Sequence, residues 1–112
     1  MVEYRHTTLD RTFAALAHPT RRAIVRTLSK GPLTVTEVAA PHEISLAAVS
    51  KHLDVLEAAG LVRRTREGRV QRCSLIAEPL AETARWVEQY RDFWELQLGA
   101  LSRFLATKGR RS

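Results

Sequence analysis

The chain contains 112 residues, of which 45% are hydrophobic, and this size predicts one compact domain with a modest core. Its 18 lysine and arginine residues exceed its 12 acidic residues and give a formal charge of +6, which favours nucleic acid or an anionic membrane surface as a partner. The single cysteine, Cys73, excludes an internal disulfide and a zinc site built on a cysteine pair, and it suits a reducing cytoplasm.

The sequence also argues against secretion and membrane insertion. The N-terminal stretch MVEYRHTTLDRTF lacks the continuous apolar core of a signal peptide, and no segment has the apolar length needed to span a bilayer. We therefore expect a soluble cytoplasmic protein with no membrane partner.

The first forty residues contain three short predicted helices. Apolar residues at helical spacing predict the first helix over 9–17, and Pro19 suits the first position of the second. A glycine followed by a proline ends the second helix. Thr34 and Glu37 have the spacing of a capping box, so a third helix is expected to begin at Thr34 and to stop by Pro41.

A fourth helix is predicted over 45–59, with Ser45 as its cap. Its apolar stripe consists of Leu46, Val49, Leu53 and Leu56. Its opposite face is small and polar, with Ala47, Ser50, Lys51 and Asp54. A helix with so small an outer face can enter the major groove of DNA.

After Gly60 the hydrophobic period changes to that of β-strands. The segment LVRRTREGRVQRCSLI predicts two strands around a Glu67–Gly68 turn, where glycine can supply the positive φ that a hairpin needs. The hairpin is basic because five arginines accompany one glutamate: Arg63, Arg64, Arg66, Arg69 and Arg72. Such a hairpin suits contact with the phosphate backbone or the minor groove of DNA.

A long last helix is predicted over about 79–105, beginning at Pro79. Its apolar and aromatic face is broad, and a short chain has little else to cover it. We expect this face to pack, with the first helix beside it, against its copy in a second subunit. The predicted dimer interface consists of Leu9, Phe13, Trp86, Tyr90, Phe93, Trp94, Leu98, Leu101 and Leu105. A pocket at this interface, open to a small apolar effector, is the alternative.

Together these elements predict a winged helix-turn-helix, mainly α with a small β-hairpin, in which four helices are followed by two strands and a final helix. We expect residues 1–107 to form a single domain and 108–112 to form a disordered basic tail. The expected partner is double-stranded DNA, with the fourth helix in the major groove and the hairpin on the backbone.

Three segments, LAHPTRRAIVRTL, LTVTEVA and ISLAAVSKHLDVLEAAGLVRRTREGR, together resemble the ArsR-type bacterial transcriptional repressors over about residues 9–76. The resemblance implies a homodimeric winged-helix repressor that binds a palindromic operator, often beside its own gene. By the same resemblance, the wing arginines contact DNA together with positions of the recognition helix, which are Ser45, Ala47, Ser50, Lys51 and His52.

The sequence departs from the metal-sensing members of that family. Those members carry a cysteine pair in the third helix, or histidine and carboxylate ligands on the last helix. Here the third helix reads TEVAAP and the last helix contains no histidine, and no two of the four histidines have i,i+3 or i,i+4 spacing. We therefore expect a metal-independent member with no cofactor.

Two single residues admit more than one interpretation. His52 is either a partly buried side chain bonded to the scaffold or a contact to a DNA phosphate. Cys73 is interpreted as an inert, half-buried thiol rather than a redox switch, because one neighbouring arginine is weak evidence for a lowered pKa.

Two other functional classes differ from a DNA-binding regulator in ways that can be tested. A protein-interaction module of the same fold would dock an acidic partner through its basic face and show no preference for the DNA upstream of its own gene. An enzyme is not expected, because the sequence shows no nucleophile and base pair, no phosphate loop and no cluster of metal ligands.

Overall fold

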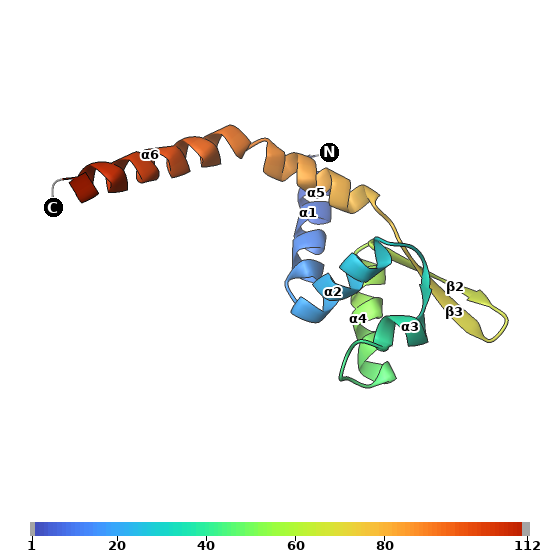
Figure 1. The fold of residues 1–112 in the computed structure, drawn as a ribbon. Coiled ribbons are helices and arrows are strands. Elements are labelled where there is room, and N and C mark those ends of the chain that lie inside the picture. The colour runs from blue at the N-terminus through green and yellow to red at the C-terminus, as the bar shows by residue number, and fades with distance from the viewer. Residues whose placement is uncertain (1, 111–112) are drawn as a thin grey trace. The chain divides into compact units, whose positions relative to one another are not determined.

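The computed structural model describes residues 2–110, with side chains described over 7–107 (Figure 1). The chain is mainly helical with a small antiparallel sheet, which confirms the predicted fold class. The chain forms two compact units that divide after Glu82. The elements are, in order, α1 (Val2–Leu16), α2 (Pro19–Leu28), β1 (Leu33–Thr34), α3 (Val35–Ala39), α4 (Leu46–Ala58), β2 (Val62–Glu67), β3 (Val70–Leu75), α5 (Glu78–Glu88) and α6 (Arg91–Arg110).

The starts of α3 and α4 confirm the predicted caps. The amide of Glu37 donates to the Thr34 hydroxyl at 3.2 Å, and the amide of Thr34 donates to the Glu37 carboxylate at 2.9 Å, so both halves of the capping box are present. At α4, the Ser45 hydroxyl accepts a hydrogen bond of 3.1 Å from the amide of Ala48. These bonds connect residues only three positions apart, which is why the sequence could predict them.

The sheet has three antiparallel strands in the order β1-β3-β2. Strands β2 and β3 form the predicted hairpin, and Gly68 in its turn has φ 64°, in the left-handed region that favours glycine. Strand β1 was not predicted, because its two residues are too few to show a period. It pairs with β3 and places Leu33 opposite Cys73, so the hairpin is bonded to the chain before α3.

The core of the first unit lies between the helices and the sheet (Figure 1). The most completely buried side chains are Ile24, Val38, Val49, Leu53, Leu56, Leu61 and Val62. Cys73 belongs to the same cluster and is wholly buried, so the prediction of a half-buried thiol understated its burial. The prediction was also wrong for Leu46, whose side chain is 55% exposed, because it belongs to the first turn of α4 and the buried stripe starts only at Val49.

The last helix is not continuous, which corrects the prediction of one helix over 79–105. Helix α5 ends at Glu88 and α6 begins at Arg91. Between them the Tyr90 amide bonds to the carbonyl of Val87, three residues back, at 3.0 Å, so the chain makes a tight turn there. Helix α6 continues to Arg110 and takes in part of the predicted tail at 108–112, while 111–112 lie outside the described residues.

The buried hydroxyl of Thr12 gives a stability prediction. This residue of α1 is wholly buried, and its Oγ1 has no hydrogen-bond partner among the described residues. Thr12→Val keeps the shape and removes the unsatisfied group, so we expect the free energy of unfolding to rise by about 1 kcal/mol in urea denaturation. As a control, Thr27→Val removes a hydroxyl that donates to the Ala23 carbonyl at 2.9 Å and is expected to give no gain. Equal gains in both variants would contradict the prediction.

Candidate nucleic-acid interface

The outward face of α4 carries side chains predicted to contact DNA. Ala47 and Lys51 are exposed and Ser50 is half-buried, whereas Val49 and Leu53 have no exposed surface. The buried residues hold the helix against the core and leave a face of small and polar groups toward solvent. Ala47 and Ser50 are small enough to let α4 approach a groove of DNA, while Leu46 is exposed at the start of the helix.

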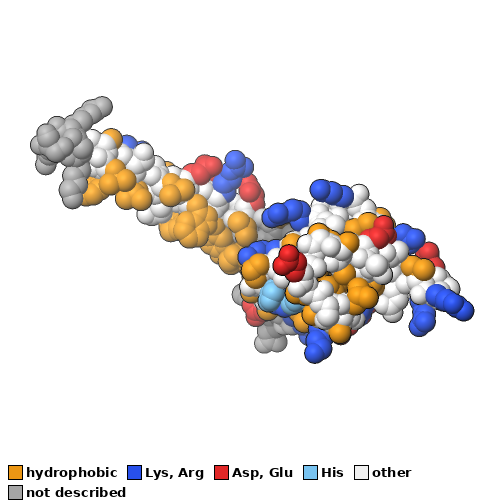
Figure 2. Space-filling view, turned by 60° about the horizontal axis from the view of Figure 1, so that its bottom comes forward, with side chains coloured by type: hydrophobic (Ala, Val, Ile, Leu, Met, Phe, Trp, Pro, Cys, Tyr) orange, Lys and Arg blue, Asp and Glu red, His pale blue; other side chains and the backbone are white. Residues whose placement is uncertain are grey.

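The hairpin of β2 and β3, called the wing below, carries exposed positive charge. Figure 2 shows Lys and Arg side chains around the hairpin end of this unit. Arg63, Arg66 and Arg69 are exposed and form no ion pair within the described part of the chain, and Arg66 Nε donates to the Gly68 carbonyl at 3.3 Å. Arg72 differs, because its Nε lies 3.4 Å from a Glu67 carboxylate oxygen.

Arg64 is placed differently from the other wing arginines. Its side chain is only 15% exposed, and its guanidinium donates to Asp54 and, at 2.9 Å, to Glu57, both on α4. The Arg64 amide also donates to the Glu57 carboxylate at 3.3 Å. These bonds raise the pKa of Arg64 and lower that of Glu57. Arg64 therefore joins the wing to α4, and little of its charge is presented to solvent.

The ring of His52 lies against α2. Its centroid is 4.5 Å from that of His18, and its Nδ1 is 3.5 Å from Arg21 Nη1. Burial lowers the pKa of His52, and the nearby charges of His18, Arg21 and His42 lower it further. Of the two interpretations of this residue, the contacts favour a side chain that packs against the scaffold.

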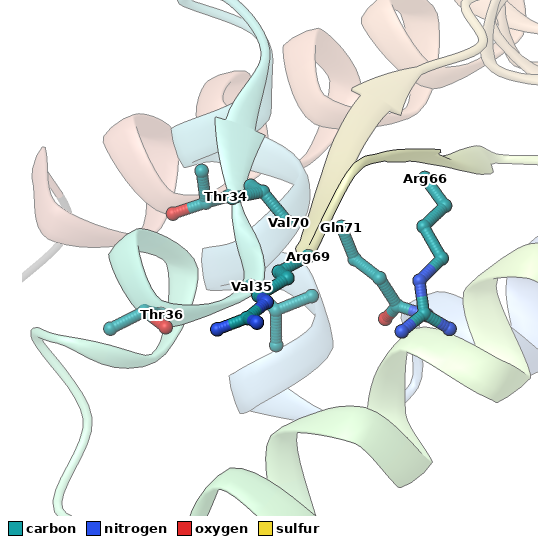
Figure 3. Close-up of a pocket in the computed structure, with 7 residues that line it drawn as sticks. All are labelled: Thr34, Val35, Thr36, Arg66, Arg69, Val70 and Gln71. Carbon is teal, nitrogen blue, oxygen red and sulfur yellow. The ribbon is translucent and has the colours of Figure 1, made fainter.

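A groove lies between the wing and the start of α3 (Figure 3). Arg66 and Gln71 are paired across the two strands of the wing, and Figure 3 shows their side chains extending side by side. The groove has a volume of about 420 Å³ and is lined by Thr34, Val35, Thr36, Arg66, Arg69, Val70 and Gln71. We call it the wing groove. Thr36 and Gln71 were not predicted as site residues, because only the folded sheet brings α3 and the wing together.

The side chains predicted for the dimer interface are mostly exposed. The rings of Trp86 and Tyr90 meet at a tilt with centroids 5.2 Å apart, and those of Phe93 and Trp94 meet edge to face with centroids 5.4 Å apart. Leu9 is an exception at 8% exposure, because its side chain is already covered within one chain and offers a partner almost no surface. The other members are between 38% and 65% exposed: Phe13, Trp86, Tyr90, Phe93, Trp94, Leu98, Leu101 and Leu105.

The described residues offer neither a metal cluster nor a membrane span. They contain no group of three or more histidine, cysteine or acidic side chains that could hold a metal ion. No described helix is both long enough and apolar enough to cross a membrane.

Comparison with known proteins agrees with this geometry. A helix-turn-helix domain family matches residues 16–65. The chain is 55% identical over 53 residues to the HTH-type transcriptional regulator Rv2034 of Mycobacterium tuberculosis, a match that spans 47% of this chain and half of that protein. It is 30% identical over 79 residues to the transcriptional repressor SdpR of Bacillus subtilis, which spans 70% of this chain and 88% of the relative.

Solved structures identify the family. A crystal structure of an ArsR family transcriptional regulator matches with a TM-score of 0.73 and 39% identity, over 80% of this chain and 92% of that one. The chain belongs to the ArsR family of transcriptional regulators. This ArsR-family regulator also matches a homodimeric winged helix-turn-helix DNA-binding domain from Mycobacterium bovis, with a TM-score of 0.61 and 27% identity over 82% of each chain.

The surroundings of His52 give a pH prediction for this ArsR-family regulator. Because its pKa is lowered in the folded protein, the unfolded chain takes up the proton first, and the free energy of unfolding falls as the pH drops below the ordinary value of 6.5. Above that value both states are neutral and the contribution vanishes. We expect His52→Gln to remove this part of the pH dependence in thermal melts between about pH 7.5 and about pH 5. Identical pH profiles for the variant and the parent protein would contradict the assignment.

Proposed function

We propose that this protein acts as a homodimeric repressor that binds a palindromic operator through α4 and the wing. The observation that carries the proposal is the set of exposed wing arginines without acidic partners, held beside the small outward face of α4 by a shared sheet and core. The unpaired positive charge suits the phosphate backbone of duplex DNA, and the adjacent helix is small enough to enter its major groove.

In this mechanism α4 reads sequence. Ser50 and Lys51 donate hydrogen bonds to base edges or to neighbouring phosphates, and Ala47 allows close approach. Ser45 already uses its hydroxyl as the cap of α4, so it contributes through the position of the helix end and its backbone. In a two-fold dimer, the two copies of α4 enter successive major grooves about 34 Å apart.

The wing supplies affinity. Arg63, Arg66 and Arg69 contact the phosphate backbone, and the wing groove offers Gln71 and Thr36 as neutral donors beside Arg66 and Arg69. Because phosphate contacts release counterions, these residues determine how steeply affinity falls with salt.

Arg64 serves as a positioning residue in this scheme. Its guanidinium is held by Asp54 and Glu57, so it fixes the wing relative to α4 and offsets two carboxylates that would otherwise repel DNA. His52 has a similar supporting role, because its contacts with His18 and Arg21 connect α4 to α2.

The second unit provides dimerisation. Its aromatic and leucine side chains on α5 and α6 leave an apolar strip along α6 that Figure 2 shows in orange. Two copies would bury this strip against each other. The homodimeric state of the Mycobacterium bovis neighbour supports this interpretation, and the repressor SdpR supports repression as the outcome.

The first test compares two labelled duplexes by fluorescence anisotropy. We expect tight binding to the DNA upstream of the protein's own gene, at least about a hundredfold tighter than to a scrambled duplex, because specific sites exceed non-specific ones by this much or more. Light scattering of the complex should give two chains per duplex. Equal weak binding to both duplexes would favour a different operator or a protein partner.

A second test addresses the wing. Replacing Arg66 and Arg69 together by alanine should weaken binding to both duplexes and reduce the slope of log affinity against log salt, by about 0.9 for each phosphate that is no longer neutralised. Arg64→Met should weaken binding with little change in that slope, since it acts through α4. Arg103→Ala, an exposed arginine of α6, is the control and should change neither quantity. An unchanged salt slope in the double variant would contradict the wing assignment.

A further inference from the structure

A groove of different character lies in the first unit, where α1, α2 and α4 meet. It has a volume of about 540 Å³, within the range of small-molecule sites. We call it the helix groove. The wing groove is lined by residues of β1, α3 and the hairpin, whereas the helix groove shares no lining residue with it. The DNA-binding function described above leaves the helix groove unused.

Most of the side chains that line the helix groove are small and apolar. Ala14 comes from α1, and Ala58 and Ala59 from the C-terminal end of α4, while Ala15 of α1 is 2% exposed and belongs to the core beneath the groove. Val55 adds a β-branched side chain that is 41% exposed. The alanine methyl groups and Val55 give this open groove an apolar surface, which suits the hydrocarbon body of a small molecule.

Arg11 places a positive charge in the helix groove. It is exposed, it makes no ion pair within the described residues, and it also lines an adjoining hollow of about 370 Å³ together with Ala58 and Ala59. The two hollows therefore share a border at Arg11. No acidic residue lines either of them.

The second arginine of the helix groove is already bonded. Arg21 Nε donates to the Ala15 carbonyl at 2.6 Å and its Nη2 to the Ala14 carbonyl at 3.2 Å. These bonds fix the groove wall at the end of α1. They leave Arg11 as the cation whose donors are available to an incoming group, since a guanidinium binds a carboxylate in a bidentate manner.

We propose that the helix groove binds a small amphiphilic carboxylate. The carboxylate pairs with the Arg11 guanidinium and the hydrocarbon body lies over the alanine methyl groups of α1 and α4. The residues that line this groove differ from those proposed to contact DNA. Arg21 lines the groove and also lies 3.5 Å from His52 of α4. The proposal does not require DNA binding, so a failure of the operator assay would leave it standing.

Octanoate is the probe. We expect it to shift the methyl resonances of Ala14, Ala58 and Ala59 in the alanine-labelled full chain, saturating with a dissociation constant of roughly 1 mM, as its size suggests. Octylammonium has the same chain and the opposite charge, and should not saturate. Arg11→Met should weaken octanoate binding about tenfold, the cost of one charge-assisted contact. Arg26→Met, which removes an exposed arginine of α2 that lines neither hollow, should leave it unchanged.

Four results would overturn the proposal. One is the absence of saturation by octanoate, and another is equal binding of octanoate and octylammonium. A third is an equal effect of the two arginine variants, with circular dichroism confirming that both fold. The fourth is a concentration-dependent shift of the same methyl groups without ligand, which would show that a second copy of the chain covers the groove.

Discussion

The structure depends on the division of α4 into a buried and an exposed face. Val49, Leu53 and Leu56 have no solvent exposure, and burial of each such side chain stabilises the fold by roughly 1.5–3 kcal/mol. With that stripe held in the core, the helix cannot rotate about its axis without exposing it. The polar face, which the proposed function assigns to DNA, is therefore presented to solvent in one orientation by a packing constraint.

The arginines of the first unit divide into those used by the fold and those left on the surface. Arg21 donates to the carbonyls at the end of α1, and Arg64 bridges the wing to α4. The N–H donors of these two guanidinium groups therefore bond to groups within the chain. The exposed wing arginines have no acidic partner within the described residues, so the wing presents positive charge that a polyanion can reach. The exposed arginines of the wing are Arg63, Arg66 and Arg69.

The second unit has the opposite chemistry, because its exposed surface is aromatic and aliphatic. Helix α6 carries ion pairs from Arg91 to Glu88 and Glu95, but Trp94 and Leu98 remain more than half exposed. The described part of the second unit contains only the end of α5 besides α6, so it cannot cover the apolar face of this helix. In the proposed dimer this surface would be buried, and a two-fold axis would relate the two copies of α4.

The sequence by itself determined features that rest on neighbouring residues. The Thr34–Glu37 capping box, the Ser45 cap and the Gly68 turn were predicted because their bonds and dihedral angles involve residues at most three positions apart. The winged-helix order was predicted from the change in hydrophobic period between the fourth helix and the hairpin. The same local patterns, together with the run of arginines, predicted α4 and the wing as a DNA-binding site.

Only the tertiary structure decided which of these side chains remain available to a partner. Arg64 was predicted as a DNA contact, and His52 either as a DNA contact or as a side chain bonded to the scaffold. In the structure Arg64 bonds to α4, and His52 lies against His18 and Arg21. Strand β1 and the break between α5 and α6 were too short to leave a periodic pattern. The physical reason is distance along the chain: His52 and Arg21 are separated by 31 positions, and no local pattern encodes a contact that only the packed core creates.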